Sequence, residues 1–232
     1  MVVFLKAPSG PAAPTLLQPQ ERVALARAPR REDPKRARAL EGGAAPLMAL
    51  ISGGEGTPGP DGYDKFYNGY KPPGMPPVTS MTLGQIDQVQ KGMLDHGVGS
   101  SAFGKYQFLR GTRAGLQKGM GIADDQVATA GLQDRMMREF LNTLGYDKFV
   151  SGRMTPQEFQ SRLAGGFASL ARGPDDKVLS PKGKRRDAPV RTFDIQATLA
   201  AAKAEHERFL QTDPYITQRI EEGYMPDVTR WR

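Results

Sequence analysis

The sequence predicts an α+β fold that is predominantly α-helical, with a small irregular β and loop insertion. Apolar residues recur at helical spacing in several stretches. The 27 glycines and 19 prolines of the 232-residue chain gather in three stretches, 7–19, 42–77 and 173–189, which indicates flexible or extended segments there. We expect four parts: an extended basic arm over 1–45, a compact domain over 46–172, a basic linker over 173–190, and a C-terminal helix and tail over 191–232.

The arm contains few large apolar residues and many Pro, Ala, Gln and Arg residues, which is a poor composition for a packed unit. Basic runs at 27–31, 35–38 and 182–186 supply much of the formal net charge of +7. Such a charge suits an acidic polymer: nucleic acid, an anionic membrane surface, or a cell wall with carboxylates and phosphate polymers. Solvated linkers are the alternative explanation of these runs.

The chain has no cysteine, so disulfides and thiolate metal sites are excluded. The two histidines, His96 and His206, are too far apart in pattern to indicate a metal pair. The apolar run near the N-terminus is too short for the core of a signal peptide. No stretch approaches the roughly 18 consecutive apolar residues of a membrane span. We therefore expect no membrane span, and delivery by a system other than a secretory signal.

The first predicted helix begins at Pro46, a residue that suits a first helical turn. Leu47, Met48, Leu50 and Ile51 form its apolar face. The helix ends in glycines that flank Glu55. Residues 57–77, rich in Gly, Pro and aromatic side chains, predict a loop or small irregular hairpin.

Five further helices follow. Thr82 and Gln85 form a capping-box signature, and apolar residues at helical spacing continue from there to a stop at Gly97. Thr155 and Glu158 predict a second capping box. The other predicted helices cover 110–119, 124–144, 156–170 and 194–211.

Glu55 is the first candidate for chemistry. A carboxylate at the edge of a cleft can be partly desolvated, which raises the pKa of a carboxyl group towards the range that a general acid needs. Glycosidic bonds break through an oxocarbenium-like transition state, so an acid must protonate the leaving oxygen. An isolated Glu after a helix is usually a surface residue or a cap. The flanking glycines favour the catalytic interpretation because they leave room for a bulky polymer.

Hydrolysis needs a second carboxylate, and Asp61 and Asp64 are close enough in sequence to be candidates, with Asp64 the better one. The structural alternative is that Asp64 caps a turn or holds the backbone of the insertion. Without a second carboxylate, a hydroxyl of the substrate itself can attack and form an internal anhydro ring.

The segment Gly104-Lys105-Tyr106-Gln107 is the second candidate site. Tyr106 offers an aromatic face and Gln107 an amide with both donor and acceptor, which suits a sugar ring and its N-acetyl group. Gly104 permits close approach of the backbone to a ligand. The alternative is that Tyr106 is a core residue.

These motifs together resemble those of the lambda-type phage endolysins, which are lytic transglycosylases of the lysozyme superfamily. The resemblance covers about residues 47–172. It rests on Glu55-Gly56-Thr57, Gly62-Tyr63-Asp64, Tyr67-Asn68-Gly69, Gly104-Lys105-Tyr106-Gln107, Leu132-Gln133-Asp134 and Ala168-Ser169-Leu170.

The resemblance implies a lysozyme-like domain that cleaves the MurNAc–GlcNAc bond of peptidoglycan. Glu55 would be the catalytic acid and base, with an anhydromuramoyl end as product and no metal or cofactor. Asp64 would match an aspartate near the cleft that need not be a nucleophile. The residues expected to contact the glycan are Thr57, Tyr63, Gly104, Lys105, Tyr106 and Gln107.

The chain departs from this family in three places. The helix over 81–96 lengthens one connection, the arm and the tail are extra, and Ala171–Asp176 replaces the Gly-Tyr-Gly motif that the family carries on the cleft side. Hydrolase and transglycosylase therefore both stay open. We expect an enzyme associated with a phage particle or its tail, or released to the periplasm and cell wall. Residues 1–45 and 191–232 would contact other proteins of the assembly. The alternative is an inactive lysozyme-like structural component, and nucleic-acid binding ranks third.

Overall fold

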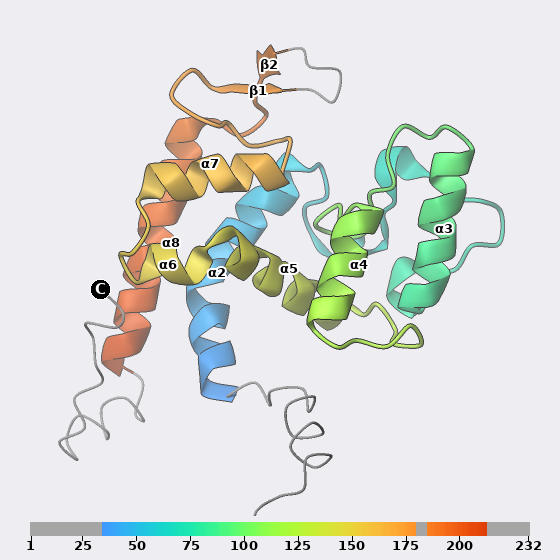
Figure 1. Cartoon of the computed structure of the whole chain (residues 1–232), viewed down its shortest axis with the longest axis horizontal. Coiled ribbons are helices and arrows are strands. Elements are labelled where there is room, and N and C mark those ends of the chain that lie inside the picture. The colour runs from blue at the N-terminus through green and yellow to red at the C-terminus, as the bar shows by residue number, and fades with distance from the viewer. Residues whose placement is uncertain (1–33, 180–184, 213–232) are drawn as a thin grey trace, which may run out of the picture. The chain divides into compact units, whose positions relative to one another are not determined.

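The computed structural model describes residues 34–179 and 185–212, with side chains from 43 to 178 and from 187 to 208. Helices dominate this part of the chain and strands are short (Figure 1). The longer helices are α2 (Pro34–Gly54), α3 (Leu83–Asp95), α4 (Arg110–Gly119), α5 (Ala130–Leu144), α7 (Pro156–Gly166) and α8 (Thr192–Thr212). The short elements are α6 (Tyr146–Val150) and the 3-10 turns η1 (Pro60–Asp64), η2 (Tyr67–Gly69) and η3 (Val78–Ser80). The predominantly helical fold is confirmed.

Helices α2 and α8 lie side by side, although one opens and the other closes the described chain (Figure 1). A close approach at Gly43 makes this packing possible. A Cβ atom at this position would lie 2.9 Å from the carbonyl oxygen of Ala202 and 2.9 Å from the Tyr146 hydroxyl. Only glycine fits against both α8 and α6 without a shift of one of them.

The predicted start of the first helix at Pro46 is wrong, because α2 begins at Pro34 and Pro46 lies inside it. An internal proline removes one backbone hydrogen bond and costs a helix about 3 kcal/mol. Packing against α8, which involves the fully buried Leu199 and Ala202, offsets that cost. Residues 34–45 thus belong to a helix of the compact unit, and the rest of the arm expected over 1–45, residues 1–33, lies outside the described residues.

In α5 and α7, one end lies where it was predicted and the other does not. The α5 helix begins at Ala130 and not at 124, because Leu83 N–H donates to the Gln126 carbonyl and draws the preceding residues into extended pairing. Thr129 then caps the helix by accepting from Leu132 N–H. The α7 helix ends at Gly166 and not at 170. Its predicted start is confirmed, with the Thr155 side chain accepting from Glu158 N–H.

The predicted capping box of α3 is confirmed in full: the Thr82 hydroxyl accepts from Gln85 N–H, and the Gln85 side chain accepts from Thr82 N–H. The predicted α4 is confirmed at both ends, and α8 matches its prediction within two residues. The expected irregular insertion is confirmed as well. Within residues 57–77 it consists of the 3-10 turns η1 and η2 and an isolated bridge that joins Phe66 to Phe103.

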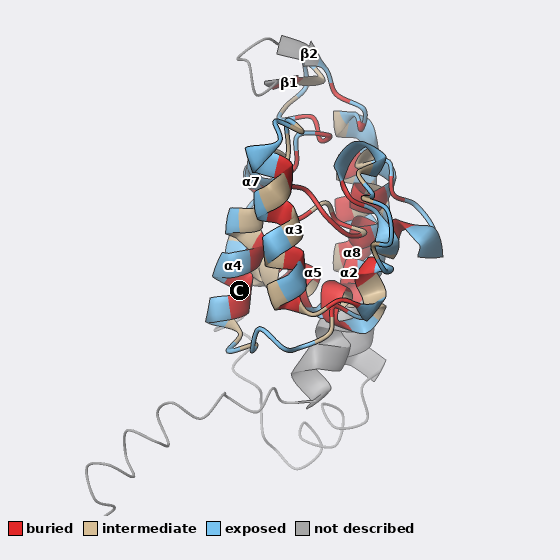
Figure 2. Ribbon diagram, turned by 90° about the vertical axis from the view of Figure 1, so that its right-hand side faces the viewer, coloured by how far each residue is buried: buried red, intermediate tan, exposed pale blue. Residues whose placement is uncertain are grey.

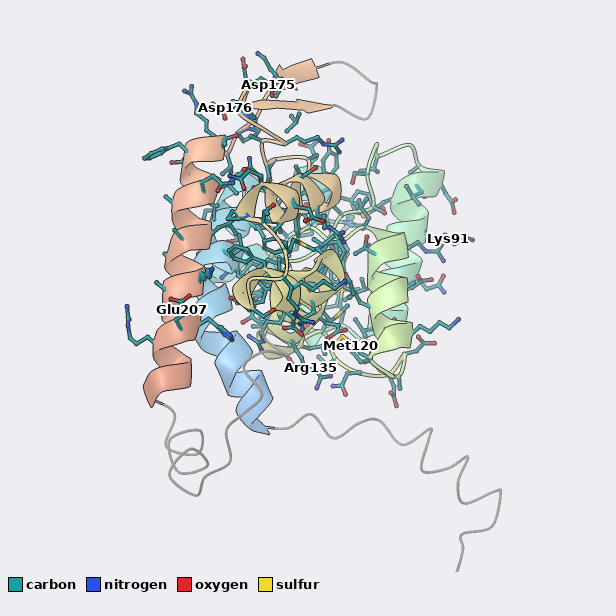
Figure 3. All side chains as sticks on the ribbon, turned by 60° about the vertical axis from the view of Figure 1, so that its left-hand side comes forward. Lys91, Met120, Arg135, Asp175, Asp176 and Glu207 are labelled. Atoms are coloured by element: carbon teal, nitrogen blue, oxygen red, sulfur yellow. The ribbon has the colours of Figure 1, made fainter. Side chains whose placement is uncertain are left out.

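The described residues of the predicted linker, 173–179 and 185–190, include two short strands. Strand β1 (Lys177–Leu179) pairs antiparallel with β2 (Arg185–Asp187), and Lys177 Nζ contacts Asp187 Oδ1 at 2.5 Å. Asp175 and Asp176 lie in the loop that leads to β1 (Figure 3). Most of the basic run at 182–186 and the tail from 213, including Trp231, lie outside the described residues.

The core runs through the helices from α2 to α8, each of which turns a buried face inward and an exposed face outward (Figure 2). Five phenylalanines form a chain of ring contacts through it, with centroids 5.5 to 6.4 Å apart: Phe66, Phe103, Phe108, Phe140 and Phe167. No helix in the described ranges combines the length and apolarity needed to cross a membrane.

Candidate functional site

Glu55 lies one residue beyond the end of α2, and the local sequence explains its position. Gly56 adopts a left-handed conformation with φ +74°, and its N–H donates to the Gly53 carbonyl. Thr57 N–H donates to the Ser52 carbonyl at 2.9 Å. This pair of bonds is the Schellman arrangement that ends many helices, and glycine is favoured at its left-handed position. The glycine after Glu55 therefore fixes the acid at the helix terminus.

Ser169, which is 114 positions away in the chain, contacts Glu55. Its hydroxyl donates to Glu55 Oε1 at 2.6 Å, while Glu55 itself is half-buried. Ser169 is held in turn by Val190, whose N–H donates to the Ser169 carbonyl at 3.0 Å. Gly54 leaves the space for this contact, since a Cβ there would lie 2.6 Å from Val190 and 2.9 Å from the Ser169 hydroxyl.

Thr57 joins the Glu55 segment to the turn at residues 104–107. The Thr57 hydroxyl lies 2.6 Å from the Lys105 carbonyl oxygen and 3.1 Å from that of Ser52. The side chain is only 3% exposed. This corrects the expectation that Thr57 contacts the glycan: its hydroxyl is used inside the protein, where it holds the two predicted segments together.

Phe103 and Phe108 close the 104–107 turn by exchanging two backbone hydrogen bonds, of 2.9 and 3.2 Å. Gly104 and Gln107 both have positive φ, at +73° and +49°. The Gln107 amide donates to the Gly104 carbonyl at 2.8 Å, so at least one amide proton of the predicted sugar contact is used within the turn. The sugar contact expected of this half-buried side chain stays a prediction.

Gly104 is buried against Gln133 of α5. A Cβ at this position would lie 2.3 Å from Gln133 Oε1, the atom that accepts from Lys105 N–H at 3.0 Å. The Gln133 amide also donates to the carbonyls of Tyr63 and Ala128. The space that only glycine leaves at 104 is therefore filled by a protein side chain, which corrects the expectation of close approach by a ligand.

Substituting Gly104 tests this packing. We expect Gly104→Ala to lower the free energy of unfolding by about 2 to 4 kcal/mol, because the new Cβ adds a steric clash with Gln133 to the strain of the left-handed backbone. Gly121→Ala is the matched control: its φ is +65°, and nothing lies within 4 Å of its Cβ position. Urea unfolding should give a clearly smaller loss for the control. Equal losses would show that backbone strain alone accounts for the effect.

Tyr106 is a core residue with 3% exposure, and its ring packs on Phe108 at 6.0 Å between centroids. The predicted open aromatic face is therefore wrong for Tyr106. Tyr63 is the more accessible of the two aromatic residues near the turn, and Lys105 Nζ lies 4.4 Å from its ring centroid, a cation–π contact.

The hydroxyls of Tyr63 and Tyr106 converge on Asp134. Both donate to Asp134 Oδ1, at 2.8 and 2.6 Å. Burial, reinforced by these bonds to a carboxylate, raises the pKa of Tyr63 to about 12. The same causes raise the pKa of Tyr106 well above its usual range. Both phenols are thus neutral donors at neutral pH.

Asp64 is exposed at the end of η1. Its Oδ1 atom accepts from both the backbone N–H and the hydroxyl of Thr79, each at 2.8 Å. This is the structural role that the sequence left open for Asp64. Its role as a second catalytic carboxylate stays a prediction.

The structure thus places Thr57 against the 104–107 turn and links that turn to Tyr63 through Gln133 and Asp134. Glu55 is bonded separately to Ser169. Ser169, Gln133 and Asp134 belong to motifs that carry the resemblance, but the sequence indicates no role for them. Nothing local signals their contacts, because each bond spans a large separation along the chain. A surface hollow beside this site is lined by residues of α2 and the segment before α8, among them Gly53, Gly54, Pro189 and Val190.

Comparison of the chain with protein-family models, curated proteins and solved structures gives no match.

Proposed function

We propose that this protein cleaves the glycan strands of peptidoglycan, with Glu55 as the proton-transfer residue. The observation that supports the proposal most is the convergence at Glu55 of segments distant in sequence. Ser169 donates to its carboxylate at 2.6 Å, and Thr57 ties the same helix end to the turn that carries Lys105. A fixed acid beside polar and aromatic groups is the equipment that glycosidic cleavage requires.

In this mechanism Glu55 donates a proton to the glycosidic oxygen as the bond to the anomeric carbon breaks. The sugar then carries the oxocarbenium charge, and the Glu55 carboxylate is ready to act as a base. If it removes the proton of the muramoyl 6-hydroxyl, that oxygen bonds to the anomeric carbon and a 1,6-anhydro end forms. If it removes a proton from water, a reducing end forms.

The contacts of Glu55 and Asp64 favour the anhydro route. Ser169 holds one oxygen of the Glu55 carboxylate, so a single positioned carboxylate can serve as acid first and as base afterwards. Asp64 Oδ1 accepts two bonds from Thr79, which favours the structural role of Asp64 over the activation of water. We therefore propose a lytic transglycosylase, in keeping with the resemblance of the motifs.

Product analysis tests the proposal. Purified full-length chain is incubated with a peptidoglycan suspension, and the soluble fragments are analysed by mass spectrometry. We expect clearing of the suspension and fragments with anhydromuramoyl ends. Fragments with reducing ends would replace the transglycosylase by a hydrolase and require a water-activating group. An absence of clearing would favour the inactive structural component of a phage particle or secretion apparatus.

The flanking segments support a proposed setting for this activity. The net charge of +7 suits an acidic wall, and residues 1–33 and 213–232 flank the described part of the chain. We propose that these segments attach the enzyme to a virion or tail, or to another system that brings it to the cell wall.

A further inference from the structure

Asp134 joins two segments that carry predicted site residues. Tyr63 belongs to η1, a few residues after the end of α2, and Tyr106 belongs to the 104–107 turn. Both hydroxyls reach the same oxygen, Oδ1 of Asp134, from residues 71 and 28 positions away in the chain. Asp134 lies in the first turns of α5, next to Gln133, which binds the backbone of the same two segments.

The outcome of this arrangement is a fixed aromatic and cationic pair. Tyr63 is half-buried, its hydroxyl is bound by Asp134, and Lys105 Nζ lies over its ring and 3.4 Å from its hydroxyl oxygen. Tyr106 is buried, and its hydroxyl donates to the same oxygen of Asp134. Two side chains that would otherwise have free rotamers are thereby held in one geometry, which lowers the entropy cost of binding a sugar against them.

We infer that Asp134 is a positioning residue for glycan binding: it holds the Tyr63–Lys105 pair in the orientation that receives an N-acetylated sugar next to Glu55. The inference rests on the proposed function. Asp134 acts through the two tyrosines and not on the glycan itself. An acceptor oxygen at this position is sufficient for the role. Asparagine at position 134 should therefore preserve glycan binding, and alanine should weaken it.

Binding of the N-acetylglucosamine tetramer, measured by calorimetry with the full chain, tests the inference. All variants carry Glu55→Gln so that turnover does not interfere. We expect Asp134→Ala to weaken binding about tenfold, the scale of a lost hydrogen bond to a charged group. Asp134→Asn should stay within about threefold of the parent, because its carbonyl oxygen still accepts from the hydroxyls. Asp125→Ala, an exposed aspartate before α5, is the control and should bind like the parent.

Spectroscopic titration of the tyrosines gives an independent readout. In the parent, Tyr63 should ionise near pH 12. Loss of the carboxylate in Asp134→Ala should lower this pKa, while the larger contribution of burial remains. A general loss of stability would not shift one tyrosine in a folded protein.

Three results would overturn the inference: no binding of the tetramer by the parent, parental affinity in Asp134→Ala, or equal losses with alanine and asparagine. If Asp134→Ala does not fold, Tyr63→Phe and Tyr106→Phe take its place, because they remove the hydroxyl donors and keep the rings. Parental affinity in both of these variants would also overturn the inference. Failure of the proposed cleavage would be a separate result. In that case the wild-type chain would bind the tetramer but release no fragments from peptidoglycan.

Discussion

Replacing Glu55 with glutamine is expected to lower the rate of peptidoglycan clearing by about 100- to 10,000-fold, the usual contribution of a general acid–base residue. Glutamine has nearly the same shape and keeps an oxygen that accepts from the Ser169 hydroxyl. It cannot transfer the proton. The fold should therefore persist while the chemistry stops, and the measurement is the loss of turbidity of a peptidoglycan suspension.

Glu207→Gln is the matched control, because Glu207 is an exposed glutamate on α8, far along the chain from the site (Figure 3). Its clearing rate should equal that of wild type. Thermal unfolding of both variants should stay close to wild type, as is usual for substitutions that leave the core intact. Equal clearing by wild type and Glu55→Gln would remove Glu55 from the mechanism.

Asp87→Ala is expected to have the largest effect on stability, about 3 to 5 kcal/mol, because it leaves a buried guanidinium without its counter-charge. The Arg113 side chain is 3% exposed and contacts Asp87, while its other nitrogens donate to Gln90 and Gln117. Burial lowers the pKa of Arg113 despite the nearby carboxylate, which indicates that desolvation of the guanidinium is costly. Urea unfolding measures the loss.

The control for this variant lies on the same helix. Asp95→Ala removes an exposed pair with Lys91, whose atoms are 3.9 Å apart, and should cost less than about 1 kcal/mol. A similar loss in both variants would contradict the assignment of Arg113 to a buried network.

The stability difference between wild type and Asp87→Asn should also depend on pH. A hydrogen bond from Arg110, with the charge of Arg113, lowers the pKa of Asp87 below its usual range. A carboxyl group with a lowered folded-state pKa stabilises the fold above its unfolded value of about 3.9 and loses that contribution as the pH falls through the folded value. The difference should therefore be constant near neutrality and shrink below about pH 4.

This network also supports the candidate site. The Gln90 amide, whose oxygen accepts from Arg113, donates to the carbonyls of Ser101 and Phe108. Those two residues bracket the segment that carries the 104–107 turn. The hollow around Arg113 and Asp124 includes none of the predicted site residues. Four of its polar residues, Asp87, Arg113, Gln117 and Asp124, bond one another, so we assign it to the structure of the domain.

The sequence determined the features that depend on neighbouring residues. The capping pairs Thr82–Gln85 and Thr155–Glu158 set the starts of α3 and α7, because side chain and backbone partners are three residues apart. The placement of Glu55 at a helix end followed from the glycine after it. The predominantly helical class followed from apolar spacing.

Only the tertiary structure decided the features that depend on distant partners. The α2 helix continues past Pro46 because it packs against α8. The Ser169–Glu55 bond spans 114 positions, and burial of Tyr106 and Thr57 was not readable from the turn motifs that contain them. The physical reason is that burial and long-range hydrogen bonds are set by which surfaces meet after folding, while local patterns fix only the helices and turns that bring those surfaces together.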